Sequence, residues 1–191
     1  MENIQQDILE ATLILFNDRG LDFTMNDIAK SMHIAKKTIY RFFSSKEELL
    51  IALLDYGFEN IQKEKQKILS SNDSIAKRLE QAMIAMPKQY AKIDFRMLVS
   101  LRDVYPEAYV RLNEHLENDW EPIIKLINEG IRKKEIRKIN TFILRQIVTA
   151  TFEQLLSTDQ LQERNLTYAK ALKEMMNIIM KGIVVDNDQN Q

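Results

Sequence analysis

The 191-residue chain contains no cysteine, and only 4 glycines and 3 prolines. Without cysteine, a disulfide bond, a thiolate metal site and a cysteine nucleophile are all excluded. The scarcity of helix-breaking residues predicts long helices and argues against a β protein with many turns. The chain is long enough to bury a core, and it fits one large or two small domains.

Segments that direct a chain to a membrane are missing as well. The first residues, MENIQQDI, lack the basic stretch and the apolar core that a signal peptide needs. No apolar run approaches the length of about 18 residues that a membrane-spanning helix requires. Together with the absence of cysteine, these features lead us to expect a cytoplasmic protein with no membrane partner.

Motifs typical of enzymes are also absent. The sequence has no Gly-rich phosphate loop and no nucleophile elbow, and it contains only 2 histidines. His115 and Asp119 are four residues apart on one predicted helix face, but two ligands do not suffice for a zinc site. Solvated charge on a long helix is the simpler interpretation of this pair. We therefore expect no enzyme activity, no metal and no cofactor.

Residues 24–46, TMNDIAKSMHIAKKTIYRFFSSK, have the pattern of two short helices joined by a tight turn. Thr24 and Asp27 have the spacing of a capping box at the start of the first helix. The turn follows at His33, and a second helix is predicted over residues 35–43. This is the spacing of a helix-turn-helix, whose second helix can lie in the major groove of DNA. The first helix carries an apolar stripe made of Met25, Ile28, Ala29 and Met32.

The same stretch is basic. Between Ile28 and Lys46 there are five basic residues and no acidic one, in a chain whose formal net charge is −1. Contact with DNA phosphates is one physical use for such a cluster, and a solvated helix face is the alternative. The turn, the capping and the charge together favour DNA binding. The basic residues are Lys30, Lys36, Lys37, Arg41 and Lys46.

Residues 8–54 resemble the DNA-binding region of the tetracycline-repressor (TetR) family of bacterial transcriptional regulators. The matching pattern is an Ala then Leu-Phe, a Gly, a Thr, Ile-Ala, Thr-Ile-Tyr-Arg-Phe-Phe and Ser-Lys-Glu-Glu-Leu, in that order. Two positions depart from the pattern. His33 replaces the usual Gly of the turn, but histidine tolerates a left-handed backbone. Ala35 replaces the usual Ser or Thr and cannot cap the second helix, which costs about 1 kcal/mol.

The resemblance implies an all-α protein. Residues 1–46 would form an N-terminal three-helix DNA-binding domain of the helix-turn-helix type, and residues 47–185 a helical domain for ligand binding and dimerisation. A helix over 46–69 would connect the two, and residues 186–191 are expected to be a disordered tail. Apolar stripes predict the other helices over 4–19, 74–90, 94–104, 106–133, 141–157 and 167–184.

The resemblance also implies which residues contact double-stranded DNA. The second helix of the motif would face base edges and nearby phosphates with Lys36, Lys37, Thr38 and Arg41. Phosphates would be held by Thr24, Tyr40 and Lys46, two of which lie near helix N-termini.

The last two predicted helices carry apolar stripes wider than one neighbouring helix would cover. Pairing these helices between two chains would bury both stripes, and the resemblance implies the same homodimer. The core of an ordinary monomer is the alternative. A dimer would present two reading helices to a near-palindromic operator. The predicted interface consists of Leu144, Ile147, Val148, Phe152, Leu155, Leu172, Met175, Met176, Ile179 and Ile183.

The helices between residues 74 and 133 are rich in aromatic residues and methionine. In the TetR family this region commonly encloses an effector pocket, and such side chains suit a hydrophobic small molecule. Core packing is the alternative. The sequence thus predicts a ligand-responsive homodimeric repressor, and a helical interaction adaptor without specific DNA binding is the other hypothesis. The candidate pocket residues are Met86, Tyr90, Tyr105, Tyr109 and Trp120.

Overall fold

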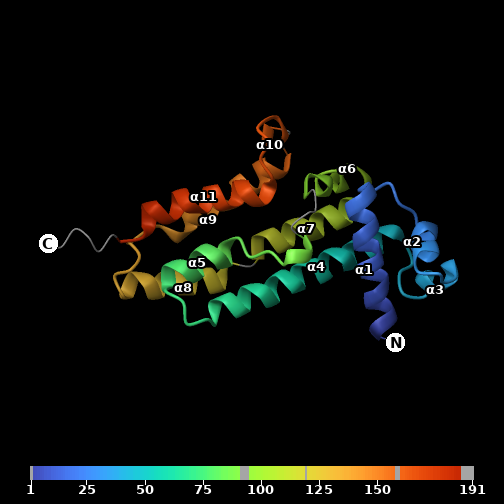
Figure 1. The fold of residues 1–191 in the computed structure, drawn as a ribbon, viewed down its shortest axis with the longest axis horizontal. Helices are drawn as coiled ribbons and strands as arrows, with labels where there is room; N and C mark the ends of the chain where they lie inside the picture. Colours follow the sequence, from blue (N-terminus) through green and yellow to red (C-terminus); the bar gives the residue numbers. More distant parts are fainter. Residues whose placement is uncertain (1, 91–94, 119, 158–159, 186–191) are drawn as a thin grey trace. The chain divides into compact units, whose positions relative to one another are not determined.

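The computed structural model describes residues 2–90, 95–118, 120–157 and 160–185, which form helices and no strand (Figure 1). The predicted all-α fold is confirmed. None of the described helices has the length and apolar character needed to cross a lipid bilayer. The predicted tail over 186–191 and Asp119 of the candidate metal pair lie outside the described residues. The elements are α1 (Glu2–Arg19), α2 (Met25–Ser31), α3 (Lys36–Tyr40), α4 (Lys46–Leu69), α5 (Ile75–Met83), η1 (Lys88–Tyr90), η2 (Phe95–Leu98), α6 (Leu101–Val104), α7 (Pro106–Asn118), α8 (Glu121–Arg132), α9 (Thr141–Ser157), α10 (Gln160–Glu163) and α11 (Tyr168–Ile183).

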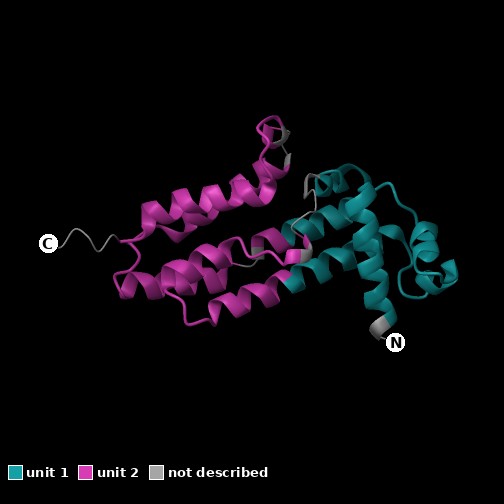
Figure 2. Cartoon of the chain, in the orientation of Figure 1, with its two compact units in different colours: residues 1–60, 92–114 teal, residues 61–91, 115–191 magenta. Residues whose placement is uncertain are grey.

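The chain divides into two compact units (Figure 2). Unit 1 contains residues 1–60 and 92–114, and unit 2 contains residues 61–91 and 115–191. Helices α4 and α7 each begin in unit 1 and end in unit 2. Unit 1 is larger than the predicted DNA-binding domain because the first half of α4 and a later segment pack with it. The predicted division into domains by function stays a prediction.

The single helix predicted over 106–133 is two helices. Helix α7 ends at Asn118, and α8 begins at Glu121 with Trp120 as its N-cap residue. Pro122 lies in the first turn of α8, where its missing N–H costs nothing. Inside a longer helix the same proline would remove a hydrogen bond and clash with the preceding turn, so the helix must restart there.

The core of unit 1 forms where α1 packs against α2. Ile8, Phe16 and Ile28 are buried, and so is Thr12, whose Oγ1 donates to the carbonyl of Ile8 at 2.7 Å. Gly20 ends α1 with φ +60°, a left-handed conformation that glycine adopts without steric cost. The helix predicted over 4–19 is therefore found, and it ends at this glycine.

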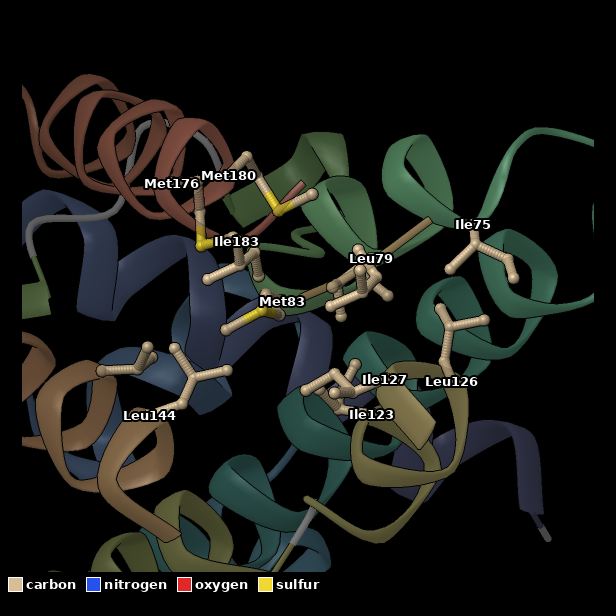
Figure 3. Packing of buried hydrophobic residues seen from close by; sticks show 13 residues of the cluster. Ile75, Leu79, Met83, Ile123, Leu126, Ile127, Leu144, Met176, Met180 and Ile183 are labelled. Carbon is tan, nitrogen blue, oxygen red and sulfur yellow. The ribbon is translucent and has the colours of Figure 1, made fainter. Parts of the chain in front are cut away.

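The core of unit 2 joins α5, α8, α9 and α11. Figure 3 shows Met176 and Met180 of α11 above Met83 of α5, and Ile127 of α8 below it. The chain after α8 folds back so that Ile136 enters this core and pairs with Val184 in an isolated antiparallel bridge. The buried members are Ile75, Leu79, Ala82, Met83, Ile123, Leu126, Ile127, Ile136, Leu144, Val148, Met176, Met180 and Ile183.

The fold makes a stability prediction at Gly130. A Cβ atom on this buried helical glycine would lie 2.4 Å from Cγ1 of Ile136 and 3.0 Å from Cγ2 of Ile75. We expect Gly130→Ala to lower the free energy of unfolding by about 1–2 kcal/mol, because the overpacking outweighs the gain in helix propensity. Urea denaturation at fixed protein concentration measures the change.

Gly57 of α4 is the matched control, since nothing lies within 4 Å of its added Cβ. Gly57→Ala should raise the free energy of unfolding by about 0.5–1 kcal/mol. If the two variants were equally stable, the packing of Ile136 over Gly130 would be wrong.

Candidate nucleic-acid interface

The interface begins at the N-terminus of α2, which is closed by a reciprocal capping box. The Thr24 hydroxyl accepts from the amide of Asp27 at 3.2 Å, and the Asp27 carboxylate accepts from the amide of Thr24 at 2.8 Å. These hydrogen bonds hold the pKa of Asp27 below its ordinary value, the Thr24 hydroxyl having the largest effect. The capping box predicted from the sequence is therefore formed.

The turn between α2 and α3 has the geometry of a Schellman motif. His33 has φ +55°, its amide donates to the carbonyl of Lys30, and the amide of Ile34 donates to the carbonyl of Ala29. This is the left-handed conformation for which glycine is usually chosen. Histidine adopts it here, so the departure from the family pattern leaves the turn intact.

Helix α3 is oriented by the residues that it buries. Ile39 is fully buried, and Phe43, just beyond the helix, is nearly fully buried. These two side chains fix one side of α3 against the rest of unit 1. The opposite side faces outward, and Thr38 lies half-buried between the two. A short helix pinned through its apolar side presents its polar side in a defined orientation. The outward side chains are Lys36, Lys37, Tyr40 and Arg41.

The exposed side of α3 is cationic with one aromatic ring in it. Nζ of Lys36 lies 5.5 Å from the centre of the Tyr40 ring, one helical turn away. Tyr40 remains 44% exposed, which is high for a large ring. Because there is no acidic residue between Ile28 and Lys46, nothing on this stretch opposes the approach of a phosphate backbone.

Two of the predicted phosphate contacts already have partners within the protein. The hydroxyl of Thr24 takes part in the capping box, and Nζ of Lys46 donates to the carbonyls of Leu21 and Phe23. Lys46 is half-buried, whereas the basic residues of α3 are exposed. The assignment of all seven residues to DNA contact stays a prediction.

The start of α4 is capped by two consecutive serines. The hydroxyl of Ser45 accepts from the amide of Glu48 at 3.0 Å, as its spacing predicts. The Glu48 carboxylate bonds to the amide and the hydroxyl of Ser44, both at 2.6 Å, and these bonds lower the pKa of Glu48. The cap connects the end of the helix-turn-helix to α4 in a fixed direction.

Ala35 offers a test of the local structure. It is the N-cap residue of α3, has an extended backbone (φ −71°, ψ 139°), and makes no side-chain capping bond. A serine hydroxyl fits this backbone, so Ala35→Ser should raise the free energy of unfolding by about 0.5–1 kcal/mol in urea denaturation. Ala35→Val is the control, since it supplies no hydroxyl and valine is as poor an N-cap residue as alanine. Equal stability of Ala35→Ser and Ala35→Val would contradict the cap geometry.

The five candidate pocket residues do not gather in one unit. Met86, Tyr90 and Trp120 belong to unit 2, where Tyr90 is buried and the other two are half-buried. Tyr105 and Tyr109 belong to unit 1, where each ring faces a cationic side chain. Their role as a pocket stays a prediction.

The ten candidate interface residues lie on two sides of α9 and α11. Ile147 is 52% exposed, and the neighbouring apolar residues Phe142, Ile143 and Ile178 are 63%, 48% and 73% exposed. The inner side of both helices belongs to the core of a single chain. Its residues are Leu144, Val148, Leu172, Met176 and Ile183. The half-buried candidates are Phe152, Leu155, Met175 and Ile179.

Known proteins share both the motif and the fold. Residues 8–53 match the model of the bacterial regulatory proteins of the tetR family. An uncharacterized HTH-type transcriptional regulator of Bacillus subtilis, YvaF, is 25% identical over 182 residues, which cover 95% of this chain and 96% of that protein.

Two crystal structures illustrate the shared fold. A TetR transcription regulator from Haloarcula marismortui is 17% identical with a TM-score of 0.75, over 97% of this chain and 100% of that one. FadR from Bacillus subtilis, solved in complex with stearoyl-CoA, is 20% identical with a TM-score of 0.68, over 92% of this chain and 95% of that one. Residues 8–53 thus carry the DNA-binding region of the tetR family of bacterial regulatory proteins, and the whole chain is similar to HTH-type transcriptional regulators.

Proposed function

We propose that this protein is a homodimeric repressor that binds a near-palindromic operator through α3 of each chain and is released by a hydrophobic effector. The observation that carries the proposal is the outward side of α3, which is basic, free of acidic residues and held in place by a buried isoleucine. Two such helices about 34–36 Å apart would enter successive major grooves.

Within this proposal the residues of α3 have separate tasks. Arg41 can form a bidentate contact with a guanine, and Lys36 and Lys37 can contact either a base edge or a nearby phosphate. Thr38 is half-buried and reaches the DNA only at close approach. Thr24 and Tyr40 would hold phosphates at the edges of the contact.

We propose the outward side of α9 and α11 as the dimer interface. Ile143, Ile147 and Ala150 recur at helical spacing on α9, and all three are exposed. On α11 the exposed Ile178 is followed four residues later by Gly182, whose α-carbon has open space around it. Small residues beside exposed isoleucines allow two helices to approach closely. Covering this side with a second copy would bury the largest exposed apolar residues of unit 2.

The effector proposal rests on chemistry and on one relative. The core of unit 2 includes four flexible methionines among its buried and half-buried members: Met83, Met175, Met176 and Met180. Such side chains adapt to a bulky apolar ligand. Because FadR was solved with stearoyl-CoA, a long-chain acyl-CoA is the first class of ligand that we would test. Such a ligand releases the operator only if it favours a conformation that does not bind DNA.

Selection of bound duplexes from a randomised DNA pool tests the proposed function. We expect an enriched near-palindrome, bound by two chains, with an affinity that falls steeply as salt rises. Stearoyl-CoA should then release the enriched duplex, while coenzyme A alone should not. A pool without enrichment, bound weakly even at low salt, would instead favour the helical interaction adaptor.

A further inference from the structure

Lys46 occupies a position that normally disfavours a cation. It is the first residue of α4, where the helix dipole is positive and acidic side chains such as the following Glu47 and Glu48 are stabilising. A lysine at this place therefore needs a partner that outweighs the dipole. DNA phosphate is one such partner, and the protein itself is the other.

The structure shows a complete set of partners inside unit 1. Nζ of Lys46 donates to the carbonyls of Leu21 and Phe23, which belong to the turn between α1 and α2. The same ammonium lies 4.2 Å from the centre of the Phe23 ring and 5.5 Å from the centre of the Tyr105 ring. Rings at these distances stabilise a cation through their electron-rich faces. The side chain thus joins three separate segments of unit 1.

The charges around Lys46 also favour a partner within the protein over a DNA phosphate. Burial lowers the pKa of its ammonium, and the carboxylates of Asp22 and Asp27 act in the opposite direction. The positive charge is therefore partly removed from water and faces two acids of its own chain. A phosphate bound at this ammonium would lie close to both carboxylates and would be repelled by them.

Further contacts attach the segment around Tyr105 to α4. The carboxylate of Glu47 accepts from the amide of Glu107 at the start of α7, at 2.9 Å. Two turns along α4, Asp55 accepts from Nε of Arg111 at 2.6 Å. Tyr105 is therefore a fixed point for the Lys46 ammonium, because the residues after it are held against α4.

We propose that Lys46 is a positioning residue that holds the turn over residues 21–23 against α4 and Tyr105, and that it does not bind phosphate. The turn leads directly into Thr24 and α2, so its position sets the direction in which the helix-turn-helix leaves α1. Lys46 acts on DNA binding only through this turn. The DNA part of the inference rests on the proposed function, and the part that concerns the turn does not.

Two measurements on Lys46→Met test the proposal. In the free protein, hydrogen exchange at the amides of residues 21–24 should become about tenfold faster, because the carbonyls lose a charged donor. The affinity of the variant for the enriched duplex should fall roughly tenfold. The slope of log affinity against log salt concentration (the salt slope) should stay at its wild-type value. A lysine that contacts phosphate behaves differently, since its loss reduces the slope by about 0.9 per contact and by about 1.8 for a dimer.

Three variants serve as comparisons. Lys37→Met removes an exposed cation of α3 and should reduce the salt slope without changing exchange in the turn. Lys125→Met removes an exposed cation of α8, outside the proposed interface, and should change neither. Tyr105→Leu should accelerate exchange in the turn, and should add little when combined with Lys46→Met, because both remove the same contact.

A reduced salt slope for Lys46→Met, or unchanged exchange in the turn, would overturn the proposal. If the wild-type protein selected no DNA, the proposed function would fail, and the exchange measurement would still decide the role of Lys46. If Lys46→Met did not fold, Lys46→Arg and Tyr105→Leu would replace it. Lys46→Arg keeps the charge and the donors, so its turn should exchange more slowly than that of Tyr105→Leu, and the reverse order would also overturn the proposal.

Discussion

Arg41→Ala should weaken binding to the enriched operator by about 1–3 kcal/mol for each half-site, without loss of the dimer. Arg41 is the exposed C-cap residue of α3, and its guanidinium lies on the outward side of the helix. A bidentate contact with a base would be lost, so discrimination at that base pair should relax as well. Fluorescence anisotropy with the operator and with single-base variants measures both effects.

Lys125→Ala is the matched control for Arg41→Ala. Its side chain is 74% exposed and pairs with Glu121 across one turn of α8. Both substitutions remove one positive charge, so they change the net charge equally. The control should leave operator affinity unchanged. An Arg41→Ala protein that bound the operator as tightly as the control would contradict the assignment, and one that lost its dimer would show that Arg41 acts on folding or assembly.

Ile147→Glu combined with Ile178→Glu should convert the protein to monomers and reduce operator affinity by at least about a hundredfold. The two side chains are 52% and 73% exposed, so a single chain tolerates the carboxylates. In a dimer they would be buried in an apolar contact, where an unpaired charge is costly. A monomer engages one half-site at a time and loses the gain from binding two at once. Sedimentation velocity and anisotropy measure the two effects.

Ile14→Glu controls for the introduction of a charge at an exposed isoleucine. Ile14 lies on α1 and is 70% exposed, comparable with Ile178. This variant should remain a dimer. If the double variant on α9 and α11 also sedimented as a dimer, the outward side of these helices would not be the interface, and the chain would have to assemble through another surface.

The helix-turn-helix could be predicted from the sequence because its signals are local. Thr24 and Asp27 are three residues apart and meet within one turn of α2, whatever the rest of the chain does. His33 follows an apolar stripe at the position where a helix must stop, and it adopts the left-handed conformation expected there. The bounds predicted for the helix over 46–69 agree with those of α4 for the same reason, since serines and a glutamate cap its start.

The orientation of individual side chains could not be predicted from the sequence. Both sides of α9 and α11 are apolar, and only packing into the core of unit 2 distinguishes the buried Val148 from the exposed Ile147. Likewise, a basic run shows that cations are present but not which way they point. The side chain of Lys36 is exposed, whereas Nζ of Lys46 donates to a backbone carbonyl in a turn more than twenty residues earlier in the chain. Pro122 is different, because a proline in the first turn is a signal in the sequence for the start of a new helix, here α8 after α7.

In the proposed repressor, two α3 helices held in one dimer bind the two half-sites of the operator together. The most direct test varies the distance between the half-sites of the enriched palindrome and measures the affinity and the number of chains bound. We expect two chains per duplex and a sharp maximum at a centre-to-centre spacing of about 10–10.5 base pairs or a multiple of it, with weaker binding when two base pairs are added or removed. Binding that is indifferent to the spacing, or one chain per duplex at saturation, would contradict the claim.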